Sequence, residues 1–251
     1  MKQLMLILSL LFAALQAQDF TPISDIQSGL VEPGTSVLIQ GVVTAGSGET
    51  PDGEFSFYIQ DGIGQFSGIN VYTADPEYAV ARGDLVELYG EYKEYAGKSE
   101  IDEPEFLDIL SSGNELPEPE VLSLDQADWE PWEGVLIRIQ SVAVSNINPG
   151  YYEWDVKEIG STNIMRIDNA YNSSYNYLPS NGDQFVSITG PLNYTYNAYK
   201  IIPRDDSDLV EADPPELLSI FYSPVYPTED SDVSVSAEIT DDGSISTVSL
   251  I

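Results

Sequence analysis

The sequence predicts an all-β protein: two tandem five-stranded barrels of the OB-like Greek-key type, then part of an immunoglobulin-like β-sandwich. Three observations support this prediction. Short runs of β-branched and aromatic residues alternate with a period near two. The pattern recurs about one hundred residues further along the chain, which indicates two copies of one domain. Glycines also fall inside the expected strands, where a small barrel must bend. The alternative is a flat sandwich with incidental glycines.

Residues 1–17 have the layout of a secretory signal peptide. Lys2 precedes an apolar run from Leu4 to Leu15, and small residues surround Ala17, after which we expect cleavage. No later stretch reaches the roughly 20 apolar residues that a membrane helix needs. We therefore expect a secreted or cell-surface protein, extracellular or periplasmic, with no membrane span in its mature form.

The first barrel is expected within residues 22–112. Its strands correspond to the runs "VLIQGVVTAGS", "EFSFYIQDG" and "GINVYT" and to a long hairpin, "LVELYGEYKEYAGKSEI", that turns near Ala96-Gly97. Gly41 and Gly90 lie inside strands and permit the sharp coiling that closes a barrel. Residues 113–132 are rich in proline and acidic residues and are predicted to be a linker, with a crossover connection as the alternative.

The second barrel is expected within residues 133–212, where the same order of segments returns. The run "EGVLIRIQSVAVS" matches "TSVLIQGVVTAGS", and "NGDQFVSITGPLNYTYNAYKII" matches "RGDLVELYGEYKEYAGKSEI". Gly90 then corresponds to Gly190 and Ile101 to Ile201. The repeat therefore predicts that the strands of the two barrels superpose.

Residues 213–251 begin a third pattern. Val233 and Val235 alternate with polar residues, and an Asp242-Gly243 turn follows. These features predict the opening strands of an immunoglobulin-like sandwich, a fold that needs roughly 100 residues. We therefore expect the chain to stop partway through this domain, and a downstream domain of the same parent chain, beyond Ile251, could hold a catalytic activity.

The composition excludes most catalytic chemistry. The chain has 42 Asp and Glu against 9 Lys and Arg, a net charge of −33, and neither His nor Cys. Imidazole and thiol catalysis, thiolate metal sites and ordinary catalytic zinc sites are therefore impossible. We predict no catalytic residues, no cofactor and no metal site, and hence no enzyme. The acidic balance indicates a solvated surface; calcium binding at acidic loops is the alternative, although no segment has the spacing of a calcium loop.

Candidate binding residues follow from the fold, because OB-folds bind ligands across strands 2 and 3 and through the loops between strands 1 and 2 and strands 4 and 5. If Phe57, Ile59 and Val71 point inward, their neighbours point outward. The candidates in the first barrel are Tyr58, Gln60, Asn70, Tyr72, Tyr92, Lys93, Tyr95 and Lys98. Those in the second barrel are Tyr194, Tyr196, Tyr199, Lys200 and Arg204, with Lys157 and Arg166 beside them.

We predict that five of these residues form one exposed surface: Tyr58, Tyr72, Tyr92, Tyr95 and Lys98. Aromatic rings with nearby cations are typical of sites that stack and neutralise single-stranded nucleic acid. The structural alternative is that the tyrosines cover the barrel flank and that the second set reflects cross-strand pairing in a hairpin.

The run "GVVTAG…FYIQDG…GINVYT…VARGDLVELYGEYKEYAGKSEI" resembles the OB-like domains found beside secreted bacterial endonucleases of the endonuclease/exonuclease/phosphatase superfamily. The run "EGVLIRIQSVAVS…GDQFVSITGPLNYTYNAYKIIPRD" is similar to the second module that commonly follows, and the C-terminal segment is similar to bacterial extracellular Ig-like repeats. The resemblance covers roughly residues 22–212. It implies an ancillary module. The superfamily's catalytic His and acidic motifs have no counterpart in this chain, so the resemblance does not carry the nuclease activity over.

Three function classes remain open. The resemblance favours single-stranded nucleic acid, whereas the negative charge opposes phosphate binding. A structural or adhesion module that positions a downstream domain needs no ligand site. Neutral carbohydrate suits tyrosine and tryptophan faces and requires no positive charge. The sequence therefore predicts a secreted, non-catalytic module that is structural or binds nucleic acid or glycan.

Overall fold

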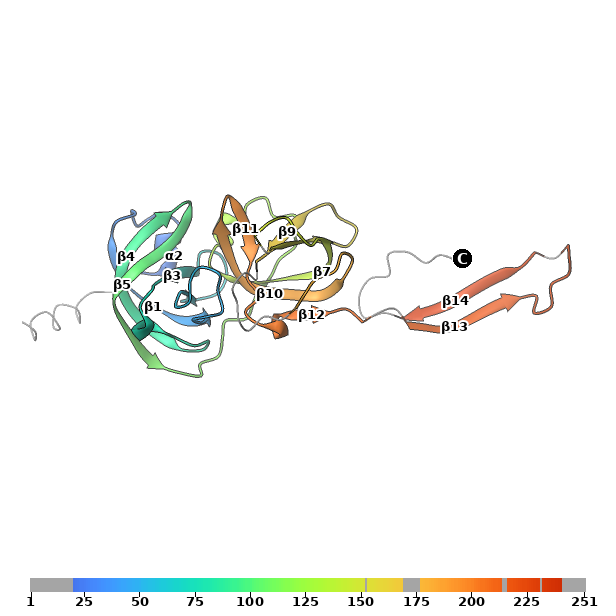
Figure 1. Cartoon of the computed structure of the whole chain (residues 1–251), viewed down its shortest axis with the longest axis horizontal. Coiled ribbons are helices and arrows are strands. Elements are labelled where there is room, and N and C mark those ends of the chain that lie inside the picture. Colours follow the sequence, from blue (N-terminus) through green and yellow to red (C-terminus); the bar gives the residue numbers. More distant parts are fainter. Residues whose placement is uncertain (1–19, 152, 169–176, 214–215, 231, 241–251) are drawn as a thin grey trace, which may run out of the picture.

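The computed structural model describes residues 20–151, 153–168, 177–213, 216–230 and 232–240. The predicted signal peptide, residues 1–17, and the predicted turn at Asp242-Gly243 lie outside these residues. Figure 1 shows two barrels side by side and a long hairpin that extends away from the second barrel. No helix within the described residues is long and apolar enough to cross a membrane.

The first barrel is a closed five-stranded sheet with the strand order β1-β2-β3-β5-β4. Its strands are β1 (Ser36–Ala45), β2 (Phe57–Gln60), β3 (Gly68–Tyr72), β4 (Leu85–Tyr95) and β5 (Lys98–Ser111). All pairs are antiparallel except β3 with β5, which is parallel. Helix α2 (Ile23–Gln27) precedes the barrel, and the 3-10 turn η1 (Pro76–Tyr78) joins β3 to β4.

The core of the first barrel follows the period of two along each strand. Val86 and Leu88 of β4 point inward, and α2 adds Ile23 and Ile26, which are three residues apart and so share one face of the helix. Gly90 lies at a tight point of the barrel wall, because a Cβ there would come within 2.6 Å of the Ile101 side chain. The strand glycine is therefore required by close packing, as the sequence predicted.

The second barrel repeats this plan and carries two extra strands. The barrel strands are β7 (Leu136–Asn146), β8 (Trp154–Glu158), β9 (Ile164–Ile167), β10 (Gln184–Thr195) and β11 (Ala198–Ile201). The sheet order is β12-β10-β11-β9-β8-β7-β6, and a further pairing of β10 with β7 closes the barrel. Gly190 lies in β10 as Gly90 lies in β4, and its Cβ would come within 2.1 Å of the Ile202 carbonyl oxygen. The predicted all-β fold class with OB-like barrels is confirmed.

The segment predicted as a linker, residues 113–132, takes part in the second barrel. It contains β6 (Glu120–Val121), which pairs in parallel with β7, and the 3-10 turn η2 (Glu130–Trp132). On the opposite edge, η3 (Asp206–Asp208) leads into β12 (Leu209–Glu211), which pairs with β10. Its pairing with β7 therefore makes β6, within residues 113–132, an edge strand of the second sheet.

The C-terminal hairpin consists of β13 (Glu216–Ser223) and β14 (Ser234–Thr240). Its side chains are largely exposed, including Leu217, Phe221 and Val235. Two strands alone do not bury a core. The immunoglobulin-like assignment therefore stays a prediction.

The two barrels are packed closely together. The backbones of Gly68 and Gly134 meet so tightly that a Cβ on Gly68 would lie 2.2 Å from the Gly134 carbonyl oxygen. Gln60 on β2 accepts a hydrogen bond from the Leu136 backbone N–H through Oε1, at 2.7 Å. The side chain of Gln27 donates to the Glu133 carbonyl oxygen of the second barrel, at 3.3 Å. These contacts bury the outer face of β2 and β3 beneath the second barrel.

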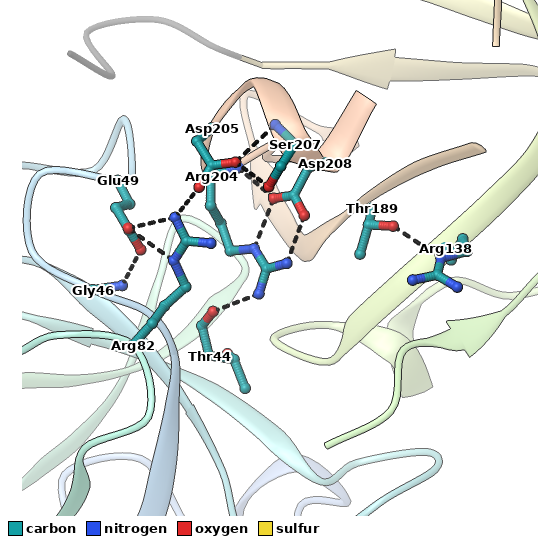
Figure 2. Close-up of polar contacts among 10 residues, drawn as sticks. All are labelled: Thr44, Gly46, Glu49, Arg82, Arg138, Thr189, Arg204, Asp205, Ser207 and Asp208. Carbon is teal, nitrogen blue, oxygen red and sulfur yellow. Dashed lines mark hydrogen bonds and ion pairs between the residues drawn. The ribbon is translucent and has the colours of Figure 1, made fainter. Parts of the chain in front are cut away.

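Arginines join the barrels at a second place (Figure 2). Arg204 pairs with Asp208 and donates to the Thr44 carbonyl oxygen of β1, at 2.9 Å. Arg82 of the first barrel pairs with Glu49 and, across the boundary, with Asp205. Together with the glycine contact, these bridges hold the barrels in one orientation.

Candidate ligand-binding cleft

A cleft of about 760 Å³ lies between the two barrels. The loop between the first two strands of each barrel contributes Asp52 on one side and Tyr151 and Glu153 on the other. The hairpin between the last two strands of each barrel contributes Tyr95 and Tyr196. The same two loops of both OB-like barrels therefore face a single space.

Turn chemistry places the two hairpin tips. Ala96 and Gly97 both have positive φ (54° and 89°), as do Tyr196 and Asn197 (52° and 60°). A two-residue hairpin turn with positive φ at both positions suits the twist of the flanking strands, and Gly and Asn tolerate it best. The first tip holds Tyr95 at the mouth of the cleft, and the second holds Tyr196 there.

Two buried lysines lie at the floor of the cleft, one from each barrel. Lys98 pairs with Asp52 (3.3 Å) and Glu100 (3.2 Å). Burial disfavours the charge on Lys98, but the two carboxylates outweigh it and raise its pKa. Lys200, 2% exposed, pairs with two other carboxylates of the second barrel, those of Glu153 and Asp168.

The charges that line the cleft sum to a negative value. Five carboxylates, from Asp52, Glu100, Asp102, Glu153 and Asp168, face two ammonium groups, from Lys98 and Lys200. The formal charge of the lining is therefore 2 − 5 = −3. Each lysine is already shared between two carboxylates, so neither has its charge free for an anionic ligand.

Tyrosine rings frame the mouth. Tyr151 and Tyr196 stack in parallel, with ring centroids 5.5 Å apart and an interplanar angle of 2°, although both are largely exposed. The ammonium of Lys200 lies 5.5 Å from the centroid of Tyr196 and supports that ring from below by a cation–π contact. Tyr95 of the first barrel is 68% exposed and lines the same cleft.

The predicted exposed surface of the first barrel is wrong. Tyr58 is 1% exposed, and its hydroxyl donates to Asp52 while its ring packs against Ile202 of the second barrel. Gln60 and Asn70 are buried beneath the same contact. Alternation did send these side chains outward, but the second barrel covers the face on which they lie.

The predicted exposure of Tyr92 and Lys98 is also wrong, for a different reason at each residue. Tyr92 has the same strand parity as Val86 and Leu88, so it belongs to the barrel core, and its burial raises its pKa to about 12. Lys98 turns into the cleft floor, where two carboxylates hold it. Of the predicted surface, only Tyr95 is exposed, while Tyr72 is half-buried and lines the cleft.

The remaining candidates divide between the cleft and internal contacts. Tyr194, Tyr196 and Lys200 line the cleft. Tyr199 is half-buried, and its hydroxyl donates to Glu130. The others lie as follows: Lys93 pairs with Asp102, Arg204 is buried against Asp208, Arg166 pairs with Glu153 and Asp155, and Lys157 is exposed.

Sequence reasoning missed the carboxylates of the cleft. The sequence does not single out Asp52, Glu153 and Asp168, because among 42 acidic residues a carboxylate pair at any spacing is common. One signal was available: Asp52 and Glu153 occupy the loop between the first two strands, where OB-folds bind ligands. Fold and cleft together define a tandem OB-type protein with a shared cleft between its barrels.

No protein-family model and no curated protein matches the chain. The second OB-fold domain of replication protein A from Methanococcus maripaludis is similar over 33% of this chain and 91% of that one, at 22% identity and a TM-score of 0.25. The Ifi202 HINa domain, solved with a 20-bp double-stranded DNA, is similar over 66% of this chain and 93% of that one, at 16% identity and a TM-score of 0.31. At these values, neither similarity says what this chain binds.

Proposed function

We propose that this chain is a secreted, non-catalytic binding module whose inter-barrel cleft binds a saccharide without acidic groups. The observation that carries the proposal is the pairing of exposed tyrosine rings with a lining of formal charge −3. Residues 1–17 support secretion, and the resemblance of residues 22–212 supports an ancillary place beside a larger extracellular protein. The absence of His and Cys supports a role without catalysis.

The chemistry of the cleft suits a sugar ring. The exposed faces of Tyr95 and Tyr196 offer flat apolar surfaces for the C–H face of a pyranose. The half-buried carboxylate of Asp102 pairs with Lys93 through Oδ2, so its Oδ1 accepts a hydrogen bond from a sugar hydroxyl. Over the whole lining, the carboxylate oxygens outnumber the lysine donors. A cleft of this size also lies within the range of ordinary ligand sites, roughly 300 to 1,000 Å³.

Single-stranded nucleic acid is the second candidate, because the loops that form this cleft are those with which OB-folds bind both oligonucleotides and oligosaccharides. Nucleic-acid affinity depends mainly on cations that neutralise phosphate. Six of the eight basic side chains within the described residues are engaged in ion pairs: Arg82, Lys93, Lys98, Arg166, Lys200 and Arg204. This use of the cations favours the saccharide.

Replacing Tyr196 with alanine is expected to weaken binding of a neutral oligosaccharide about tenfold, because one stacking face and its contact with Lys200 are lost. Isothermal titration calorimetry against a panel of neutral oligosaccharides measures this. Tyr226→Ala is the matched control, since Tyr226 is 89% exposed and does not line the cleft. It should bind like the parent chain.

The same titrations with an oligothymidylate separate the two candidates. The saccharide proposal expects no binding of the oligonucleotide at 150 mM salt. Oligonucleotide binding that weakens as salt rises, and that Tyr196→Ala reduces, would instead establish the nucleic-acid function. Equal affinities of Tyr196→Ala and Tyr226→Ala for every glycan would refute the cleft as the site.

A further inference from the structure

A second hollow, of about 580 Å³, lies on the outer face of the second barrel and shares no lining residue with the cleft. Leu136 and Arg138 of β7 and Ser187 and Thr189 of β10 form its floor. Residues 115–119 and the turn that carries Arg204 and Asp208 form its walls. We call this hollow the outer groove.

Arg138 is the unusual residue of the outer groove. Its Nε donates to the Thr189 hydroxyl at 3.0 Å, and within the described residues it forms no ion pair. Figure 2 shows the contrast: Arg82 and Arg204 end on carboxylates, whereas Arg138 reaches a single hydroxyl. A guanidinium has five N–H donors, so its outer edge keeps donors for a ligand. In a chain of net charge −33, an arginine that pairs with no carboxylate among the described residues is notable.

A free hydroxyl lies on the same face. Ser187 and Thr189 are two residues apart on β10, so their side chains share one side of the sheet, and Thr189 is in register with Arg138. Ser187 is 7% exposed, and its hydroxyl makes no hydrogen bond with any described residue. The pairing of β7 with β10 therefore places the Arg138 guanidinium and the Ser187 hydroxyl on the same face of the sheet, where both line the outer groove.

We propose that the outer groove binds the carboxylate of a hydroxylated organic acid. The Arg138 guanidinium holds the carboxylate as a planar fork, and the Ser187 hydroxyl donates a further hydrogen bond. This site goes beyond the proposed function of the cleft, because it selects a negative group that the cleft excludes. The ligand is either a free hydroxy acid or a uronate residue of a saccharide.

The local charges favour a carboxylate over a phosphate. Arg204 is committed to Asp208, so the groove offers one cation without an ion-pair partner among the described residues. Glu115 and Glu118 line the groove as exposed side chains and add negative charge near its edge. One guanidinium matches a singly charged planar carboxylate, whereas a phosphate dianion needs more positive charge.

Titration of the full chain with sodium D-glucuronate, followed by NMR shifts of backbone amides in β7 and β10, tests the proposal. Arg138→Gln should weaken binding about tenfold or more, because a charge-assisted hydrogen bond is lost. Arg138→Lys should recover part of the affinity but not all, since an ammonium keeps the charge without the fork. Ser187→Ala should weaken binding by a smaller factor.

Lys157→Gln is the matched control, because it removes one exposed positive charge that does not line the outer groove. It should bind glucuronate like the parent chain. D-Glucose should leave the groove amides unmoved, and Tyr196→Ala should leave glucuronate binding intact, which separates this site from the cleft. Sodium gluconate, an open-chain hydroxy acid, distinguishes the two sources: binding of gluconate as tight as glucuronate identifies a free acid, and weaker binding identifies a sugar ring.

Three results would overturn the proposal. The first is no shift of the groove amides at 50 mM glucuronate. The second is equal affinity of Arg138→Gln and Lys157→Gln. The third is an Arg138→Lys variant that folds, by its amide spectrum, and binds no more tightly than Arg138→Gln.

Discussion

Replacing Gly68 with alanine is expected to lower the free energy of unfolding by about 3 kcal/mol and to abolish ligand binding in the cleft. The new Cβ would lie 2.2 Å from the Gly134 carbonyl oxygen and 2.7 Å from the Val135 nitrogen. Both are backbone atoms, so no side-chain rotation relieves the contact. Overpacking in a tight core typically costs about 1 to 3 kcal/mol, and rigid backbone neighbours place this site at the upper end.

Binding should be lost because the cleft exists only while the barrels stay in contact. Separation would move Asp52 and Tyr95 of the first barrel away from Glu153 and Tyr196 of the second. Urea unfolding and saccharide titration measure the two effects.

Gly62→Ala is the matched control for Gly68→Ala. Gly62 lies between β2 and β3, and the nearest atom to its new Cβ is the Ser67 Cβ at 3.9 Å, an ordinary contact. We expect the control to unfold and bind like the parent chain. If both variants show the same urea midpoint, the glycine contact does not hold the barrels together.

Replacing Glu133 with glutamine is expected to stabilise the protein above neutral pH and to remove part of its pH dependence. Glu133 is 2% exposed, and it accepts a hydrogen bond from the Ser99 backbone N–H through Oε1 at 2.7 Å. Its Oε2 is buried and has no hydrogen-bond partner among the described residues. Burial, with Glu130 and Glu94 nearby, raises the pKa of the Glu133 carboxyl to about 8 against the lowering effect of the Ser99 hydrogen bond.

The sign follows from proton linkage. The folded state binds a proton at Glu133 more tightly than the unfolded state does. Below the unfolded pKa, near 4.5, the carboxyl is neutral in both states and does not lower the free energy of unfolding. As pH rises, the ionised Glu133 lowers the free energy of unfolding. This destabilisation is complete above about pH 8, where it reaches about 3 to 5 kcal/mol. Glutamine keeps the acceptor for Ser99 and is never charged, so the variant should gain this amount at pH 9 and little at pH 4.5.

Urea unfolding at pH 4.5, 7 and 9 measures the difference between Glu133→Gln and the parent chain. Glu105→Gln is the control, because it removes one negative charge from an exposed position. A difference that is equal at all three pH values, or that Glu105→Gln reproduces, would contradict a buried titrating carboxyl at Glu133.

The sequence by itself determined the strands and the repeat. Alternation is a local property, so Ile59 and Val71 are buried as expected, and Gly90 and Gly190 lie at equivalent tight points in the two barrels. The burial of Tyr92 could also have been read locally, because its parity matches that of Leu88. Hairpin tips were predictable in the same way, since turn residues such as Ala96-Gly97 act within a few positions.

Only the tertiary structure decided where the candidate site lies. Tyr58 and Gln60 point out of the first barrel, as alternation requires, yet the second barrel covers them. Lys98 and Lys200 look like free cations in the sequence. The fold brings Asp52 from a loop to Lys98, beside Glu100 of the same strand, and brings Glu153 and Asp168 to Lys200. The reason is physical: alternation states which face a side chain occupies, whereas burial and ion pairing depend on what packs against that face. In this chain, that partner is a copy of the same fold about one hundred residues away.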